Sequence, residues 1–215
     1  MAAAVDRLSG GRLILGVGAG WNVPEHEAFG LPFPSLKERF DNLEAGIARI
    51  RQTWRENRPA PVRGECPLLI GGGGEKRTLA IAAREAAEWN LNYADLDTFK
   101  AKLEVLHRHC QAAGRDPKEI RVSMMATYLV GRDRAELRQR VERLAGVLVR
   151  LQGLDPDQAL ERLRERAFVG TPEEIAGQML PYVEAGMDLF CLQHFLLDDG
   201  DALRLLSEEV RPALR

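Results

Sequence analysis

The chain has 215 residues, of which 45% are hydrophobic and 29% charged, a composition typical of a soluble globular protein. Its formal net charge of −2 lacks the basic excess of a nucleic-acid-binding surface, and no apolar run approaches the roughly 20 residues of a membrane span. The three cysteines, Cys66, Cys110 and Cys191, are far apart, which argues against a disulfide framework. We therefore expect a cytoplasmic protein with reduced thiols that binds neither nucleic acid nor a membrane.

Short apolar runs that end in glycine or polar residues predict strands, and longer periodic segments predict helices. The strands are expected at residues 13–17, 67–70, 89–92, 120–130 and 189–193. The helices are expected at about residues 35–54, 76–87, 96–113 and 201–214, with residues 132–185 helical in two or three pieces. Ser35 with Glu38, and Thr171 with Glu174, have the spacing of capping boxes and mark two helix starts.

Strands that alternate with helices indicate a parallel α/β sheet. The pattern repeats about five times along residues 1–215, which we treat as a single domain. A closed (β/α)8 barrel has eight strand–helix units and typically about 250 residues. The expected fold is therefore a partial (β/α)8 TIM barrel of about five parallel strands with outer helices.

The first candidate site follows the first predicted strand, in the segment 16–22. Gly18 and Ala19 belong to a run of alternating glycines that lets a ligand approach the backbone closely. A dinucleotide-binding turn would need a helix to begin at once, but prolines delay the helix to Ser35. The alternative is a long loop over a pocket, in which Trp21 and Asn22 line a ring or substrate; Trp21 could instead simply cap the core.

The second candidate site is the glycine-rich turn, residues 71–78, between a predicted strand and a predicted helix. Its members are Gly71, Gly72, Gly73, Gly74, Glu75, Lys76, Arg77 and Thr78. Free backbone N–H groups and the positive end of a helix attract an anion, and Lys76 and Arg77 add charge. The P-loop pattern fails, because Arg77 rather than Ser or Thr follows Lys76. The segment predicts a phosphate-binding turn; the alternative is a tight turn with no ligand.

Other polar residues follow the remaining predicted strands and could reach a ligand at a barrel mouth. They are Asn90, Asn92, Tyr93, Gln193 and His194. A lone histidine is more often structural than catalytic, and a solvated loop explains Glu25, His26 and Glu27 as well as acid–base chemistry does. On a helix, His107 and His109 point to different faces, so no metal site is expected.

Together these pieces resemble the luciferase-like monooxygenase superfamily, in particular its flavin- and deazaflavin-dependent oxidoreductases. The matching stretches are residues 8–22, 29–34 with 38–40, 69–74 with Lys76 and Thr78, 89–90, and 169–174. The resemblance runs in order along nearly the whole chain. It implies a (β/α)8 barrel of which this chain has the last five units, because the family has about three further units before Leu8. The segment 55–66 is also shorter than the family's, which carries an extra hairpin there.

The resemblance implies a homodimeric oxidoreductase or monooxygenase that transfers hydride to, or oxygenates, a small organic substrate with coenzyme F420 or FMN. Residues 71–78 would hold the coenzyme phosphate, and residues 18–22 with Asn90 would line the ring and substrate side. No catalytic residue is assigned, since the coenzyme carries the redox chemistry. Two alternatives stay open: a non-catalytic remnant that keeps the phosphate-binding turn, and a barrel enzyme that acts on a phosphorylated metabolite.

Overall fold

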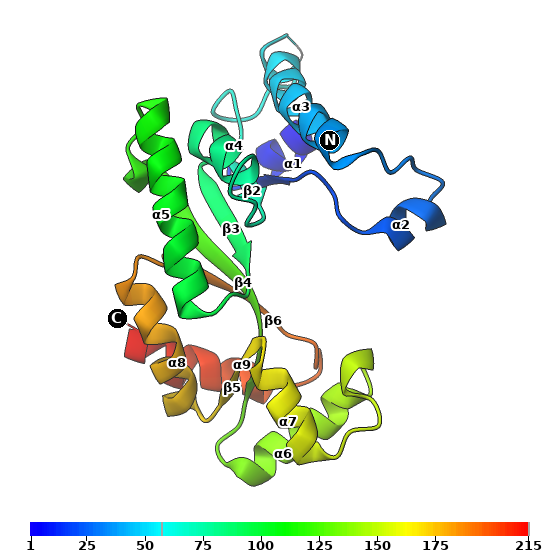
Figure 1. Ribbon diagram of the computed structural model, residues 1–215, viewed down its shortest axis with the longest axis vertical. Helices are drawn as coiled ribbons and strands as arrows, with labels where there is room; N and C mark the ends of the chain where they lie inside the picture. The colour runs from blue at the N-terminus through cyan, green and yellow to red at the C-terminus, as the bar shows by residue number, and fades with distance from the viewer. Residues whose placement is uncertain (57, 215) are drawn as a thin grey trace. The chain divides into compact units, whose positions relative to one another are not determined.

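The structure is a computed structural model that describes residues 1–56 and 58–214. The chain divides into two compact units, one of Met1–Asn90 with Lys102–Arg121, the other of Leu91–Ala101 with Val122–Arg215 (Figure 1). That residues 1–215 form a single domain stays a prediction.

The first unit is built on three parallel strands in its described part. They are β1 (Leu15–Val17), β2 (Leu68–Gly71) and β3 (Glu88–Asn92), in the order β1–β2–β3, and β3 runs on into the second unit. The helices are α1 (Ala2–Leu8), α2 (Val23–Ala28), α3 (Leu36–Glu56), α4 (Thr78–Glu85), α5 (Leu96–Ala113) and the short η1 (Pro117–Glu119). Helix α5 begins in the second unit, and most of it lies in the first.

The second unit also has parallel strands, with β4 (Arg121–Val130) paired to β5 (Ala167–Gly170) and to β6 (Leu189–Gln193). Its helical segments are α6 (Arg134–Ala145), η2 (Val149–Leu151), α7 (Pro156–Arg164), α8 (Pro172–Glu184), α9 (Gly200–Leu205), η3 (Leu206–Val210) and η4 (Arg211–Leu214). Helices α6 and α7 pack against one another (Figure 1), and together with Leu129 and Val169 they form an apolar core.

The predicted fold class is confirmed: parallel strands alternate with helices, and each of the five predicted strands is present. The two capping boxes are also present. The Ser35 N–H donates to the Glu38 carboxylate at 2.9 Å and the Glu38 N–H donates to the Ser35 hydroxyl at 3.3 Å, and Thr171 and Glu174 cap α8 in the same reciprocal way. Capping boxes can be predicted from the sequence because both partners lie within one helical turn.

Several elements differ from the prediction. The strand β5 lies in the region 132–185, where two or three helices and no strand were expected; its four residues are all buried, too short a run to show any period. The short helices α1 and α2 were not expected. The closing helix predicted at residues 201–214 is a succession of α9, η3 and η4 instead.

Strand β2 explains how the first unit presents a site. Leu68 and Ile70 are buried on one face of the strand, whereas Leu69 and Gly71 lie on the other, less covered face. Burying a side chain the size of Ile70 contributes about 1.5–3 kcal/mol to the free energy of folding, which fixes the register of the strand.

Among the described helices, none is both long and apolar enough to cross a membrane.

Candidate functional site

The glycine-rich turn begins where β2 ends. Gly71, the last residue of β2, is in register with Asn90 of β3, and Ile70 is in register with the fully buried Trp89. Because side chains alternate along a strand, Gly71 and Asn90 share the face opposite to Ile70 and Trp89. The structure therefore brings two predicted site residues together on the more open face of the sheet.

Both backbone groups of Gly72 are fixed by β3. The Gly72 N–H donates to the Asn90 carbonyl at 2.9 Å, and the indole N–H of Trp89 donates to the Gly72 carbonyl at 2.8 Å. The φ of Gly72 is +114°, a conformation that only glycine adopts without strain. The conformation of the turn at Gly72 is thus fixed by its backbone hydrogen bonds to β3 and by its positive φ. The Trp89 indole, which the sequence did not identify as a site residue, donates one of these hydrogen bonds.

At position 74, glycine is required by lack of space and not by a positive φ. A Cβ on Gly74 would lie 2.8 Å from the Oγ1 of Thr78, the buried first residue of α4. The chain therefore closes tightly onto the helix start. Arg77 precedes α4 as its N-cap and makes no side-chain capping hydrogen bond. The N-terminus of α4 thus keeps its positive end without a side-chain acceptor at the N-cap, as an anion-binding turn requires.

Helix α5 holds the far side of the turn. His109 Nε2 lies 2.8 Å from the Glu75 carbonyl oxygen, and Lys102 Nζ lies 3.1 Å from the Glu75 carboxylate. Glu75 is consequently engaged with α5, whereas Lys76 is exposed. Among the described residues no group of three or more His, Cys, Asp or Glu side chains could hold a metal ion, and His109 has this structural partner instead.

Arg77 is not free to face a ligand. Its guanidinium forms ion pairs with Asp41, at 2.7 Å, and with Glu44, both on α3, and it lies 5.2 Å from the ring of Phe40. The hydrogen bonds to Asp41 and then to Glu44 raise the pKa of Arg77 above its ordinary value. Its charge is already neutralised by two carboxylates, so Arg77 joins α4 to α3, and Lys76 is the exposed cation of the turn.

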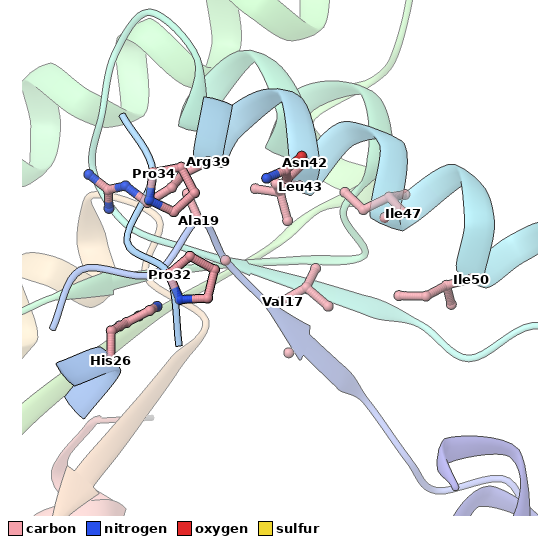
Figure 2. A pocket seen from close by; sticks show the side chains of 13 residues that line it. Val17, Ala19, His26, Pro32, Pro34, Arg39, Asn42, Leu43, Ile47 and Ile50 are labelled. Carbon is pink, nitrogen blue, oxygen red and sulfur yellow. The ribbon is translucent and has the colours of Figure 1, made fainter. Parts of the chain in front are cut away.

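A cavity of about 570 Å³ lies between β1 and α3 (Figure 2). Gly18 and Ala19 line it from the segment after β1, and Arg39, Leu43 and Ile47 line it from α3. The remaining lining residues are Gly16, Val17, His26, Pro32, Pro34, Asn42, Gly46 and Ile50. The two predicted residues Gly18 and Ala19 therefore do border a cavity. Helix α3 contributes much of the wall of this cavity.

The other two predicted residues of this segment lie elsewhere. Trp21 is 81% exposed and is not among the residues that line this cavity. Asn22 is the N-cap of α2, where its Oδ1 accepts from the Glu25 N–H at 3.4 Å. His26, considered above for acid–base chemistry, has its Nδ1 2.8 Å from the Asn22 carbonyl oxygen, so it also stabilises α2. Of these four predicted residues, Gly18 and Ala19 line the cavity, and Trp21 and Asn22 do not.

Arg39 organises the loop above this cavity. Its guanidinium donates to the Gly20 carbonyl and lies 4.1 Å from the centre of the Phe33 ring, which the His26 ring meets edge-on at 4.8 Å. These contacts join the end of β1, helix α2 and the start of α3. The segment between α2 and α3, with Pro32 and Pro34, is therefore held in place by Arg39, Phe33 and His26, of which only His26 was a candidate from the sequence.

In the second unit, polar residues gather where β4 and β6 end. The Tyr128 hydroxyl lies 2.6 Å from His194 Nδ1, and the two rings are stacked 5.7 Å apart. Thr127 Oγ1 donates to the Gln193 side-chain oxygen at 3.4 Å. Tyr93, by contrast, packs edge-on against Phe168 at 5.6 Å within an aromatic cluster, where burial raises its pKa.

Comparison with known proteins identifies the family. The sequence profile of luciferase-like monooxygenases matches residues 1–189. An F420-dependent glucose-6-phosphate dehydrogenase of Amycolatopsis mediterranei is 27% identical over 255 aligned positions, which cover 99% of this chain and 73% of the relative. An FMNH2-dependent dimethylsulfone monooxygenase of Pseudomonas putida is 22% identical over 150 positions, which cover 62% of this chain and 40% of the relative.

Solved structures agree on the fold. An F420-dependent secondary alcohol dehydrogenase in complex with an F420–acetone adduct superimposes with a TM-score of 0.80 at 22% identity, covering 100% of this chain and 73% of that one. The chain matches only 45% of the length of uncharacterized proteins of Mycobacterium tuberculosis and Mycobacterium bovis, at 29% identity over 130 positions and 53% of this chain. The relatives named for a coenzyme use F420 or FMNH2, the two coenzyme types that the sequence predicted. From residue 1 to residue 189, this chain belongs to the luciferase-like monooxygenase family.

Proposed function

We propose that the chain is a flavin- or deazaflavin-dependent oxidoreductase that binds F420 or FMN through a phosphate at the glycine-rich turn. The observation that carries the proposal is the geometry of this turn. Gly71 faces open space next to Asn90, and Gly72 is held by β3. The turn then leads directly into the N-terminus of α4. Family membership adds the coenzyme class, since the relatives named for a coenzyme use F420 or FMNH2.

The residues present fit a phosphate. A Cβ on Gly71 would meet no atom within 4 Å, so this position is open to a ligand. The helix end supplies backbone N–H donors and a positive dipole, and the exposed Lys76 adds a cation. The guanidinium of Arg77 would act indirectly, by keeping α4 against α3.

The bound coenzyme would supply the hydride or oxygen chemistry. The chain's own part is to bind and orient: the turn would anchor the phosphate, and the Asn90 amide lies on the same face of the sheet for a hydrogen bond. Gly18 and Ala19 come from the neighbouring strand end. We assign no catalytic residue, and we propose a small organic substrate and a cytoplasmic location.

We also propose a homodimer. In the first unit Trp21, Phe29 and Leu36 are 81%, 77% and 59% exposed, and Leu31 is 57% exposed. So many large apolar side chains within one short segment favour burial against a second copy. Sedimentation velocity tests this: a dimer that dissociates when Trp21 and Phe29 are replaced by serine supports it, and a monomeric native chain rejects it.

The function is tested by titrating the purified 215-residue chain with FMN, reduced FMN and F420, followed by fluorescence. Saturable binding of one coenzyme supports the proposal, and turnover with a reduced coenzyme and an organic acceptor completes it. Binding without turnover would favour the non-catalytic remnant. Preference for sugar phosphates over both coenzymes would favour an enzyme of a phosphorylated metabolite.

A further inference from the structure

The cavity between β1 and α3 is kept open by a glycine in the middle of the helix. The residues of α3 that line this cavity of about 570 Å³ follow the spacing of one helix face, at Arg39, Asn42, Leu43, Gly46, Ile47 and Ile50. A Cβ on Gly46 would meet no atom within 4 Å. Glycine inside a helix costs about 1 kcal/mol relative to alanine. Helix α3 therefore has a destabilising residue at a position where a larger side chain would occupy the cavity.

One end of the cavity is apolar (Figure 2). Leu43 and Ile47 are 9% and 3% exposed, and Val17 of β1 and Ile50 are half-buried. Burial of apolar surface against such a wall contributes about 25 cal/mol per Å². The volume of the cavity lies within the usual range for sites that bind small molecules. This end therefore suits the hydrocarbon part of a ligand.

The other end of the cavity is polar and cationic. Arg39 and Asn42 line it from α3, and His26 lines it from α2. In Figure 2, Arg39 and His26 lie at the end away from Ile50. Among the described residues that line the cavity, none is Asp or Glu, and Arg39 alone has a permanent charge. The cavity thus combines an apolar wall with one cation.

The charge of Arg39 is not neutralised within the described part of the chain. Its recorded contacts are the Gly20 carbonyl, to which Nη1 donates, and the Phe33 ring, 4.1 Å from the guanidinium carbon. Arg77, by contrast, pairs with two carboxylates. Of the other Arg39 nitrogens, Nε is shielded from solvent and Nη2 is accessible, and neither has a partner among the described residues. An accessible donor on an unpaired guanidinium favours an anionic ligand.

The neighbouring polar groups indicate which anion fits. Asn42 is exposed, and its amide has no hydrogen-bond partner among the described residues, so it can donate to an anion held by Arg39. His26 Nδ1 lies 2.8 Å from the Asn22 carbonyl oxygen and therefore donates to it, which leaves Nε2 of the neutral ring as an acceptor. One guanidinium and one amide suit a planar carboxylate, whereas a phosphate dianion would keep an uncompensated charge.

We propose that this cavity binds a small monocarboxylate with a hydrocarbon body. The carboxylate accepts from Arg39 Nη2 and the Asn42 amide, and the body packs against Val17, Leu43 and Ile47. The glycine-rich turn contributes no residue to the lining, so this is a second binding site, beyond the proposed function. Binding there requires no coenzyme.

The test is isothermal titration calorimetry of the full 215-residue chain with four probes. Cyclohexanecarboxylate has both the charge and the body, cyclohexanecarboxamide lacks the charge, and acetate and inorganic phosphate lack the body. We expect saturable binding of cyclohexanecarboxylate that weakens as the salt concentration rises. The other three probes should bind at least about tenfold more weakly, which corresponds to about 1.4 kcal/mol each.

Three substitutions on α3 locate the ligand. Gly46→Leu places a side chain in the cavity and should weaken cyclohexanecarboxylate binding at least about tenfold, while the melting temperature stays the same or rises because leucine is a better helix former. Ala48→Leu adds the same side chain at an exposed position outside the lining and should leave the affinity unchanged. Asn42→Leu, also at an exposed position, removes only the amide and should weaken binding severalfold.

Absence of saturable cyclohexanecarboxylate binding overturns the inference, and native affinity in both Gly46→Leu and Asn42→Leu rejects its location. Equal affinity for the carboxamide rejects the role of the Arg39 charge. Equal affinity for acetate or phosphate rejects the role of the apolar wall. Carboxylate binding by a chain that binds neither FMN nor F420 would reject only the proposed function, whereas coenzyme binding without carboxylate binding would reject only this inference.

Discussion

Gly71 and Gly72 are neighbours in the glycine-rich turn, yet alanine at each should have a different effect. Gly72 has a φ of +114°, where an L-residue is strained by about 1–3 kcal/mol. A Cβ there would also touch Thr78 Cγ2 at 3.4 Å. Gly71 has no positive φ, and its Cβ would meet no atom within 4 Å. Gly71→Ala should therefore leave the fold unstrained while placing a methyl group where we expect the phosphate.

The expected magnitudes differ accordingly. A loss of about 2 kcal/mol lowers the melting temperature of a domain of this size by about 4–8 °C, which we expect for Gly72→Ala. Gly71→Ala should melt at or slightly above the native temperature, because alanine in a strand is favoured over glycine by about 0.5–1 kcal/mol. It should bind coenzyme at least about tenfold more weakly, a loss of about 1.4 kcal/mol.

The assays are thermal unfolding followed by circular dichroism and coenzyme titration followed by fluorescence, both on each variant. Native-like coenzyme affinity in Gly71→Ala would refute the phosphate position. Native-like stability in Gly72→Ala would refute the strained conformation of the turn.

Three further variants test residues in and around the candidate sites. Lys76→Gln should weaken coenzyme binding severalfold and reduce its salt dependence, while the exposed Lys118→Gln should do neither; equal effects would reject a specific role for Lys76. Trp89→Phe removes the donor to the turn carbonyl and should lower the free energy of unfolding by about 1 kcal/mol or more, as measured by denaturant titration. The hydrogen bond from Arg140 lowers the pKa of the Asp199 carboxyl, so its stabilisation is present above the ordinary pKa of 3.8 and is lost as the pH falls through the lower, folded value. Asp199→Asn should flatten this part of the pH–stability profile, and an unchanged slope would contradict the assignment.

The sequence predicted those features whose partners are close along the chain. The capping pair Ser35 and Glu38 lies within one turn of helix, and the glycines after residue 70 follow a short buried run. Strand β5 was missed because its four buried residues show no period of their own, and only pairing with β4 makes them a strand. Its existence is decided by tertiary contact.

The same distinction applies inside the candidate site. Arg77 was predicted as a phosphate ligand from its position in the turn. Its carboxylate partners Asp41 and Glu44 lie on another helix, so this pairing cannot be predicted from a local sequence pattern. The support of the turn by Trp89 and His109 also depends on which elements pack together. Tyr128 and His194 meet because β4 pairs with β6 across a long stretch of chain.

We propose above that this chain binds a redox coenzyme through the glycine-rich turn. The most direct measurement is a fluorescence titration of the 215-residue protein with FMN and F420, repeated with Gly71→Ala. We expect saturable binding of at least one coenzyme and an affinity about tenfold or more weaker in the variant. Absence of binding by the native chain, or equal affinity of native chain and variant, would contradict it.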